Sequence, residues 1–409
     1  MALPLKASYD MLMKPSMSDI AVVGGGPAGF VAAILLAQSG AGVRLYAPPP
    51  PRDQRTTALL RDSVALMQSA GVWDMAQKHA AALNVMRMVD NTGRLFRAPT
   101  VSFDSAEDGG GPFGYNIRNV DLHAALQARA ARLKNLAVIH AMIDTVTPND
   151  DKVQISGRDG STAAVRLVVG ADGYRSICRN AADITLNEHR YEQTALAFNV
   201  THTLPHNDTS TEFHTRTGPF TLVPLPGREC GVVWVVRPDE AQLILALDDD
   251  ALCERVREKS YGILGDITGA SPRGAFPLMR ATADRLAANR IALVGEAGHV
   301  LPPIGAQGLN LGFRDAAVLC EIVEDANRDG RDPGADDVLA EYDARRKADV
   351  AGRAAAIDLL NRSVLSGFIP FQLARSAGLA LAKHSSHVRT IMTSLGMGNV
   401  GETPRLMRG

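Results

Sequence analysis

The sequence predicts an α/β (α+β) fold, in which a layer of parallel strands and helices carries an inserted mixed or antiparallel β-sheet and ends in helices. At 20–39, 165–176 and 290–314, a short apolar run leads into a glycine-containing turn, which is typical of a buried parallel strand. Between about 190 and 280, polar and apolar residues alternate as in antiparallel strands. A chain of 409 residues is also too long for one small core, so two domains are expected.

The composition excludes several classes of protein. The chain is 46% hydrophobic and 21% charged, with a formal net charge of −1, which provides no basic face for a nucleic acid. Its four cysteines form no C-x-x-C pair, so neither a disulfide framework nor a metal site is predicted, and a reducing, cytoplasmic location fits. No window reaches the roughly 18 apolar residues of a membrane span. Residues 1–18 are expected to be a disordered tail rather than a signal peptide.

The first glycine-rich turn predicts a dinucleotide site. An apolar run, Ile20–Val23, is followed by Gly24, Gly26 and Gly29 in the spacing G-x-G-x-x-G, and a helix is expected from Phe30. In a Rossmann-like unit, this order of strand, turn and helix places a pyrophosphate at the helix N-terminus.

The ribose anchor of such a unit is missing from its usual position. An Asp or Glu is expected at the end of the second strand, but Ala47 stands there, followed by four prolines. Asp53 lies beyond those prolines, so weaker adenosine binding is expected. Arg55 follows, either as a clamp for a phosphate or as a solvated loop arginine.

Two further turns fit the same ligand. Asp172 follows the strand at 165–170, and ligands of open α/β sheets bind at such carboxyl ends, although an Asp-Gly pair is also an ordinary turn. In the third stretch, Pro302 and Pro303 exclude a helix, and helical spacing resumes at about 309–324. The N-terminus of that helix suits a ring that gains negative charge, as a reduced flavin does; a plain strand–loop–helix crossover is the alternative.

The remaining segments predict a second sheet and a helical end. Residues 186–280 are expected to form a substrate-binding β-sheet domain that covers a site built by the first domain. Three histidines within it have no metal-ligand spacing and are interpreted as surface residues: His202, His206 and His214. A long helix is expected at 339–360. The apolar segment 363–395 with interspersed cations is expected to lie at a membrane surface, cap the core or form a dimer seam.

Together the three turns predict one elongated cofactor lying across one sheet edge. No second G-x-G-x-x-G follows a strand, so a nicotinamide nucleotide would bind only transiently.

From Asp19 to Gly398 the chain resembles a known family, the single-component (group A) FAD-dependent aromatic hydroxylases. The resemblance rests on the first glycine turn, on Gly170-Ala-Asp172-Gly173-x-x-Ser176-x-x-Arg179 and on Gly295-Glu-Ala-Gly-His299-x-x-Pro302-Pro303. Within this group the chain is similar to the ubiquinone-biosynthesis hydroxylases. That similarity rests on Arg55-Thr-Thr-Ala-Leu, Tyr115-Asn-Ile-x-Asn119-x-x-Leu122, Gln307-Gly-Leu-Asn310-Leu-Gly312 and Arg375-Ser-Ala-Gly-Leu379.

The resemblance implies a p-hydroxybenzoate hydroxylase-like fold with bound FAD. The implied FAD-binding residues are Gly24, Gly26, Gly29, Arg55, Asn119, Asp172, Glu296, Pro303, Gly308, Leu309 and Asn310. Glu296 replaces the aspartate that binds the ribityl chain in this family, and Asp172 is implied to lie near FAD and the nicotinamide path. The resemblance assigns no side chain here as a catalytic acid or base.

The expected domains follow from these assignments. They are a FAD-binding domain at 19–185, the substrate domain at 186–280, a second FAD-binding part at 281–345 and a C-terminal helical region at 346–409. The implied reaction is hydroxylation of a polyprenylated phenol in ubiquinone biosynthesis with FAD, NAD(P)H and O₂. Two alternatives remain: a weakly flavin-binding scaffold of a quinone-biosynthesis complex, and a hydroxylase of a small soluble aromatic. Peripheral contact with the inner membrane and a homodimer are further expectations.

Overall fold

The computed structural model describes residues 19–49, 53–93, 99–109, 111–303, 305–365 and 402–408. The expected tail at 1–18 lies outside these residues, as does most of the apolar segment at 363–395. No helix among the described residues is long and apolar enough to cross a membrane.

A six-stranded sheet forms the first layer, and its strand order brings the three glycine turns together. The order is β19 (Ala287–Ala288), β20 (Ile291–Leu293), β12 (Leu167–Gly170), β1 (Ile20–Val23), β2 (Val43–Tyr46) and β8 (Leu136–Ile139). All neighbours are parallel except β19 and β20. The carboxyl ends of β1, β12 and β20 therefore lie side by side at one edge, as the sequence predicts.

Both faces of this sheet are covered, which explains why its strands are continuous apolar runs. One face packs against α1 (Pro27–Gln38), α4 (Asn119–Ala130) and α8 (Gln307–Arg328). The other packs against α5 (Ile177–Ala181) and a three-stranded antiparallel sheet of β9 (Ile143–Pro148), β10 (Val153–Gly157) and β11 (Thr162–Val165). Helix α1 lies between the sheet and the helices α4 and α8, and nine of its twelve residues are buried. A helix that is covered in this way is apolar on every side, as the sequence of α1 is.

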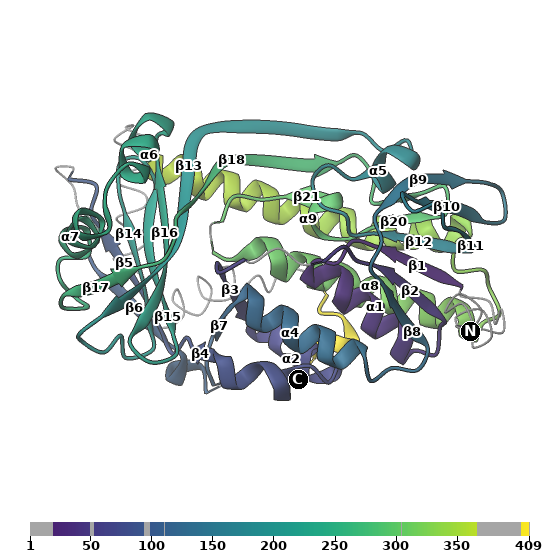
Figure 1. The fold of residues 1–409 in the computed structure, drawn as a ribbon, viewed down its shortest axis with the longest axis horizontal. Helices are drawn as coiled ribbons and strands as arrows, with labels where there is room; N and C mark the ends of the chain where they lie inside the picture. The colour runs from purple at the N-terminus through teal and green to yellow at the C-terminus, as the bar shows by residue number, and fades with distance from the viewer. Residues whose placement is uncertain are drawn as a thin grey trace, which may run out of the picture.

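A larger sheet forms the second layer. Its strands follow the order β21 (His299–Val300), β18 (Gly274–Ala283), β13 (Leu186–His202), β16 (Glu229–Val236), β15 (Pro219–Leu225), β14 (Thr209–His214), β5 (Val85–Asp90) and β6 (Val101–Asp104), and β17 (Ile267–Ala270) pairs with β13. Its outer face is covered by α6 (Pro238–Leu245) and α7 (Asp249–Lys259). The long strands β13 and β18 run along one side of the molecule and join the two layers (Figure 1). This sheet thus takes strands from 85–104 and 299–300 as well as from 186–280.

The remaining elements connect the layers. A small antiparallel sheet contains β3 (Thr56–Leu60), β7 (Gly114–Arg118) and β4 (Ala80–Ala82), and beside it lie α2 (Arg61–Ser69), α3 (Trp73–Ala76) and η1 (Gln77–His79). Directly after η1, Ala80–Ala82 pair with β7. Short 3₁₀ turns are η2 (Ser105–Asp108), η3 (Gly295–Ala297) and η4 (Arg405–Met407). The long helix α9 (Asp336–Leu365) packs against α8.

Candidate functional site

The three glycine turns pack directly against one another. A side chain on Gly24, whose φ is +121°, would place its Cβ 2.1 Å from the carbonyl oxygen of Ala171. A Cβ on Gly312 in α8 would lie 3.1 Å from Cα of Gly295 and 3.4 Å from Cβ of Ala28. These approaches require glycine, because a larger residue would separate the first turn from the other two.

The first turn leaves open space where an anion would bind. A Cβ on Gly26 would meet nothing within 4 Å, whereas one on Gly29 would lie 2.0 Å from the carbonyl oxygen of Gly24. Gly26 is the N-cap of α1, and no side chain caps that helix. The first N–H groups of α1 are thus available to a pyrophosphate, which the helix dipole also favours.

The missing ribose anchor has a packing explanation. Ala47 is only 2% exposed, and a Cβ on Gly25 would lie 2.6 Å from the Ala47 Cβ. Ala47 also extends the pairing with β8, because its N–H donates to the carbonyl of Ile139 at 2.9 Å. The alanine side chain therefore packs behind the glycine turn, and this strand end carries no carboxylate.

Asp53 instead joins two of the residues implied to contact FAD. Arg55 donates to both carboxylate oxygens of Asp53 through Nε at 2.8 Å and Nη2 at 2.7 Å. Asn119 Nδ2 donates to the same carboxylate at 2.9 Å, and the Asn119 N–H donates to the Arg55 carbonyl. Burial opposes ionisation of Asp53, but these bonds outweigh it and hold its pKa below the ordinary value. The sequence offered only its position, past the prolines, as a signal for Asp53.

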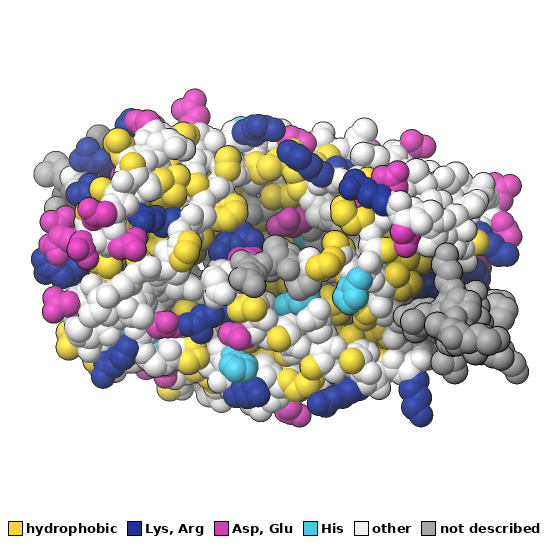
Figure 2. Space-filling view, viewed as in Figure 1, with side chains coloured by type: hydrophobic (Ala, Val, Ile, Leu, Met, Phe, Trp, Pro, Cys, Tyr) yellow, Lys and Arg dark blue, Asp and Glu magenta, His cyan; other side chains and the backbone are white. Residues whose placement is uncertain are grey.

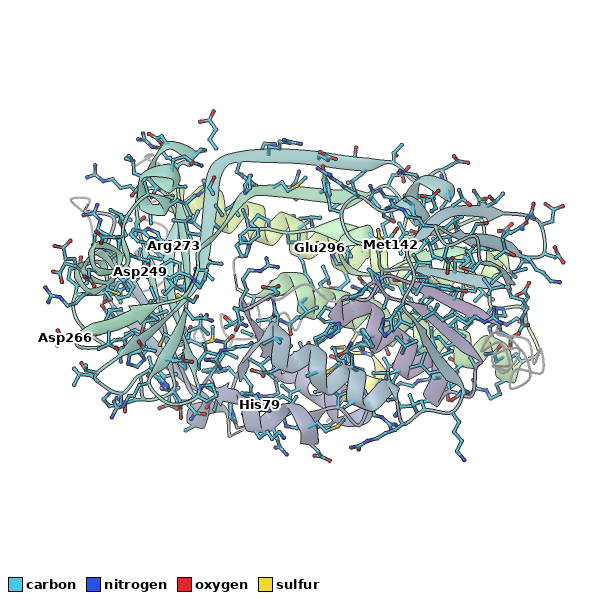
Figure 3. All side chains as sticks on the ribbon, viewed as in Figure 1. His79, Met142, Asp249, Asp266, Arg273 and Glu296 are labelled. Atoms are coloured by element: carbon cyan, nitrogen blue, oxygen red, sulfur yellow. The ribbon has the colours of Figure 1, made fainter. Side chains whose placement is uncertain are left out.

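Arg55 also connects the two layers. Its guanidinium carbon lies 4.5 Å from the ring centroid of Phe276 in β18, a cation–π contact. The hydrogen bond to Asp53 raises the pKa of Arg55, and the charge of Glu296 acts in the same direction. Glu296 is exposed and lies in the middle of the molecule, at the edge of the parallel sheet that faces the larger sheet (Figure 3). Arg55, Asn119 and Glu296 therefore border one region.

Asp172 has a structural role that the sequence did not predict. Its carboxylate accepts hydrogen bonds from Ser176 Oγ at 2.6 Å and from the N–H of Ile177 at 2.8 Å, so it caps the start of α5. Arg179 then donates through its N–H to Ser176 Oγ and through Nη1 to the carbonyl of Ala297, at 2.9 and 3.0 Å. The Asp-Gly motif thus holds the third turn in place.

An asparagine ties the loop before α8 to β3. Asn310 Oδ1 accepts a hydrogen bond from the N–H of Leu60 at 2.9 Å, and Nδ2 donates to the carbonyls of Ala58 and Ala306. Ala306, the N-cap, has a left-handed backbone with a φ of 54°. A Cβ on Gly308 would meet nothing within 4 Å, so the first turn of α8 is open to a ring stacked there.

The other two residues implied for this loop differ in exposure. Pro303 is exposed and Leu309 is half-buried. Leu309 packs partly against the hydrophobic core, whereas Pro303 is open to solvent.

A buried ionic cluster lies behind this loop. Asp315 in α8 is fully buried; its carboxylate accepts hydrogen bonds from the Gly295 N–H at 2.9 Å and from Arg346 Nε at 2.8 Å, and it pairs with His299 Nε2 at 2.6 Å. Burial opposes its ionisation, but the charges of His299 and Arg346 outweigh that effect and lower the pKa of Asp315 to about 2.

Three adjacent side chains on the wall opposite the turns are uncharged. Strand register places Ala197 beside Val233, and Val233 beside Thr221, on one face of the larger sheet, and all three are half-buried. Two positions along the same face, Asn199 donates through Nδ2 to the carbonyl of Gln54 at 2.9 Å, so this face is directed at the first layer. Figure 2 shows the molecule hollowed between the layers, with acidic and basic side chains in the hollow.

The three histidines of the larger sheet have partners of their own. His202 and His214 are 3% and 6% exposed, so their interpretation as surface residues is wrong. His202 approaches Cys230, and His214 pairs with Glu212. Within the described part of the chain, no group of three or more His, Cys, Asp or Glu residues could hold a metal ion. A cavity of about 100 Å³ lined by His206 and Cys230 lies on the outer side of the sheet.

Comparison with known proteins identifies the family. The sequence profile of the FAD binding domain family matches residues 17–355. The chain belongs to this family. It is 33% identical to ubiquinone hydroxylase UbiL of Rhodospirillum rubrum, over 96% of this chain and 93% of that protein. It is 29% identical to 3-demethoxyubiquinol 3-hydroxylase of Escherichia coli, over 90% and 95% of the two chains.

Solved structures confirm the p-hydroxybenzoate hydroxylase-like fold. The p-nitrophenol 4-monooxygenase PnpA of Pseudomonas putida has a TM-score of 0.76 at 19% identity, covering 94% of this chain and 98% of that one. HpxO of Klebsiella pneumoniae, complexed with FAD and uric acid, has a TM-score of 0.75 at 19% identity, covering 97% and 100%. The chain is a FAD-dependent monooxygenase, and both the cofactor and the resemblance predicted from the sequence are confirmed.

Proposed function

We propose that this monooxygenase hydroxylates the aromatic ring of a polyprenylated phenol in ubiquinone biosynthesis, using NAD(P)H and O₂. The observation that carries the proposal is the set of adjacent uncharged side chains, Ala197, Val233 and Thr221, opposite the glycine turns. A prenylated ring requires uncharged surface beside it, which these three side chains supply. The names of the relatives from R. rubrum and E. coli support the same substrate class.

The chain's own residues bind and orient the reactants. The N-terminus of α1 and Gly26 are suited to the pyrophosphate of FAD, Glu296 to its ribityl chain, and the open first turn of α8 to its ring. When bound, FAD supplies the oxygen-transfer chemistry. Phe276, 37% exposed, and the wall then exclude water and set the position of the phenol ring.

Arg55 and Asn119, held by Asp53, form the polar side of this site. Asp172 stabilises it from behind through α5. The assignment of FAD-binding residues and the domain limits at 185, 280 and 345 are parts of this proposal.

Peripheral contact with the inner membrane is also part of the proposal, because a polyprenylated substrate partitions into the bilayer. A complex with other quinone-biosynthesis proteins, or a homodimer, would serve the same purpose by shielding the prenyl chain. Flotation of the purified protein with anionic vesicles, compared with its sedimentation in their absence, separates the first arrangement from the others.

The decisive experiment compares two phenols that differ only in the prenyl tail. Purified protein incubated with FAD should show flavin absorption, and the prenylated phenol should stimulate NAD(P)H oxidation and give a product one oxygen atom heavier. Faster coupled turnover of the tail-free phenol would favour the alternative, a hydroxylase of a small soluble aromatic. A protein that remains colourless would instead favour the scaffold. The quinone intermediates of cells lacking the protein then identify the step.

A further inference from the structure

The buried ionic cluster extends from Asp315 to the loop that precedes α8. Asp349 in α9 accepts hydrogen bonds from Arg346 at 2.5 Å and from Arg353 at 2.7 Å, and it also pairs with Arg314 at 3.1 Å. Arg353 Nη1 donates to Gln307 Oε1 at 3.0 Å. Gln307 in turn donates through Nε2 to the carbonyl of Gly305 at 3.1 Å. A continuous chain of polar contacts thus links α9 to the backbone of the loop.

Among the described residues, this cluster has more arginines than buried carboxylates. Its three arginine side chains, Arg314, Arg346 and Arg353, are 4%, 1% and 8% exposed, and the similarly buried carboxylates that pair with them there are Asp315 and Asp349. A third carboxylate, Asp62, is 28% exposed and lies 3.5 Å from Arg314, so water screens it more strongly. Buried positive charge acts over a longer range than exposed charge, because the surroundings screen it less.

Arg353 is the member of the cluster that reaches the loop. Its partner Gln307 is the first residue of α8, where free N–H groups and the helix dipole already favour negative charge. The charge of Arg353 adds to that field from behind the helix. Burial of Arg353 also fixes the direction of its guanidinium, since two of its nitrogens are held by different elements.

We propose that Arg353 is a positioning residue for the flavin: through Gln307 it sets the loop at the start of α8, and its buried charge makes reduction of the bound FAD more favourable. This inference rests on the proposed FAD site at that loop. Two electrons and one proton convert oxidised FAD to its anionic reduced form, and NAD(P)H supplies the hydride. The negative charge that remains on the flavin ring is the charge that Arg353 would stabilise.

Loss of the charge should leave the fold intact. In Arg353→Gln, Asp349 keeps Arg346 and Arg314 as partners, so this buried carboxylate stays paired. Arg353→Lys keeps the charge but loses the planar guanidinium group, whose two nitrogens bind Asp349 and Gln307. The matched control is Arg328→Gln, which removes one charge from an arginine that is 64% exposed at the other end of α8, about 30 Å away.

The experiment measures the midpoint potential of bound FAD and its affinity for sulfite, which also forms an anionic flavin adduct, in each FAD-loaded protein. Arg353→Gln should lower the ratio of reduced to oxidised FAD at a fixed potential about tenfold. This corresponds to a shift of about −30 mV in the midpoint potential of a two-electron couple. The affinity for sulfite should fall by a similar factor. Arg353→Lys should recover most of the potential, but not the wild-type affinity for FAD. Arg328→Gln should match the wild type.

An Arg353→Gln protein with wild-type potential and sulfite affinity would overturn the inference. So would an equal shift in Arg328→Gln, because net charge alone would then explain it. The wild-type protein could bind FAD yet hydroxylate no prenylated phenol, while Arg353→Gln still shows the expected shifts. That result would refute the proposed function and leave the role of Arg353 standing.

Discussion

The carboxylate of Asp315 accepts a hydrogen bond from the backbone N–H of Gly295 at 2.9 Å, across a sequence separation of 20 residues. This bond ties the turn that carries Glu296 to α8. The first turn of α8 faces the same region as Glu296. Because Asp315 is fully buried, it also requires compensating charge, which His299 and Arg346 provide. The third turn is therefore anchored from inside the protein rather than by its own glycines.

Replacement of Asp315 by Asn should cost about 3–5 kcal/mol of unfolding free energy, because Arg346 loses a buried partner. The pKa of Asp315 is lowered from 3.8 to about 2 in the folded state, so its carboxylate stabilises the fold above about pH 4, and this stabilisation is lost as the pH falls toward 2. Urea titrations of both proteins should thus give a constant difference near neutral pH and a smaller one below pH 4.

The control for this prediction is Asp325→Asn, which changes a partly exposed carboxylate paired with Arg328 in the same helix. Its loss should cost at most about 1 kcal/mol. Equal costs at Asp315 and Asp325 would contradict the anchoring role.

Two glycines of the first turn should respond oppositely to alanine. Gly24→Ala places a Cβ 2.1 Å from the Ala171 oxygen at a positive φ, so the protein should be destabilised by more than about 3 kcal/mol or fail to fold. Gly26→Ala meets no protein atom and has a φ of −72°, so its melting temperature without FAD should match the wild type. Its Cβ projects toward the anion site and should weaken FAD binding at least about tenfold. Wild-type FAD affinity in Gly26→Ala would place the pyrophosphate elsewhere.

Asp53→Asn tests the polar side of the site. The carboxylate is the shared acceptor of Arg55 and Asn119, and loss of one charged hydrogen bond costs about 1.5–3 kcal/mol. Fluorescence titration with FAD should therefore show affinity lowered by about tenfold or more. Asp144→Asn, which breaks an exposed pair with Arg158, is the control and should bind FAD normally. Tighter binding by Asp53→Asn would mean that Asp53 competes with the cofactor for Arg55.

Ala306→Gly should stabilise the protein. A left-handed backbone at alanine costs about 1–2 kcal/mol, and glycine removes that cost. Glycine also raises the entropy of the unfolded chain, which destabilises the folded state by about 0.5–1 kcal/mol. The expected net gain is between about 0 and 1.5 kcal/mol, visible as a higher melting temperature. Ala316→Gly, in the interior of the same helix, should lower it. Reduced stability of Ala306→Gly would show that the Ala306 methyl group contributes more through packing than its backbone loses.

The sequence alone determined the parallel layer, its three turns and the cofactor. Short apolar runs ending at Gly24, Gly170 and Gly295 report buried strands, because a strand covered on both faces must be apolar throughout. The G-x-G-x-x-G spacing is equally local, since it depends on the backbone within one turn. The larger sheet was predicted only in part, because β5 and β6 join it through pairing with β14, more than 100 residues away.

Tertiary structure alone decided which side chains meet. Asp53 could be assigned to Arg55 and Asn119 only once α4 and β3 were placed together, and Asp172 became a cap only once α5 began at Ile177. The pairing of Asp315 with Arg346, and the link from Arg353 to Gln307, join two helices whose separate sequences show only amphipathic spacing. Periodicity records whether a residue is buried, whereas the partner of a buried charge depends on how the elements pack.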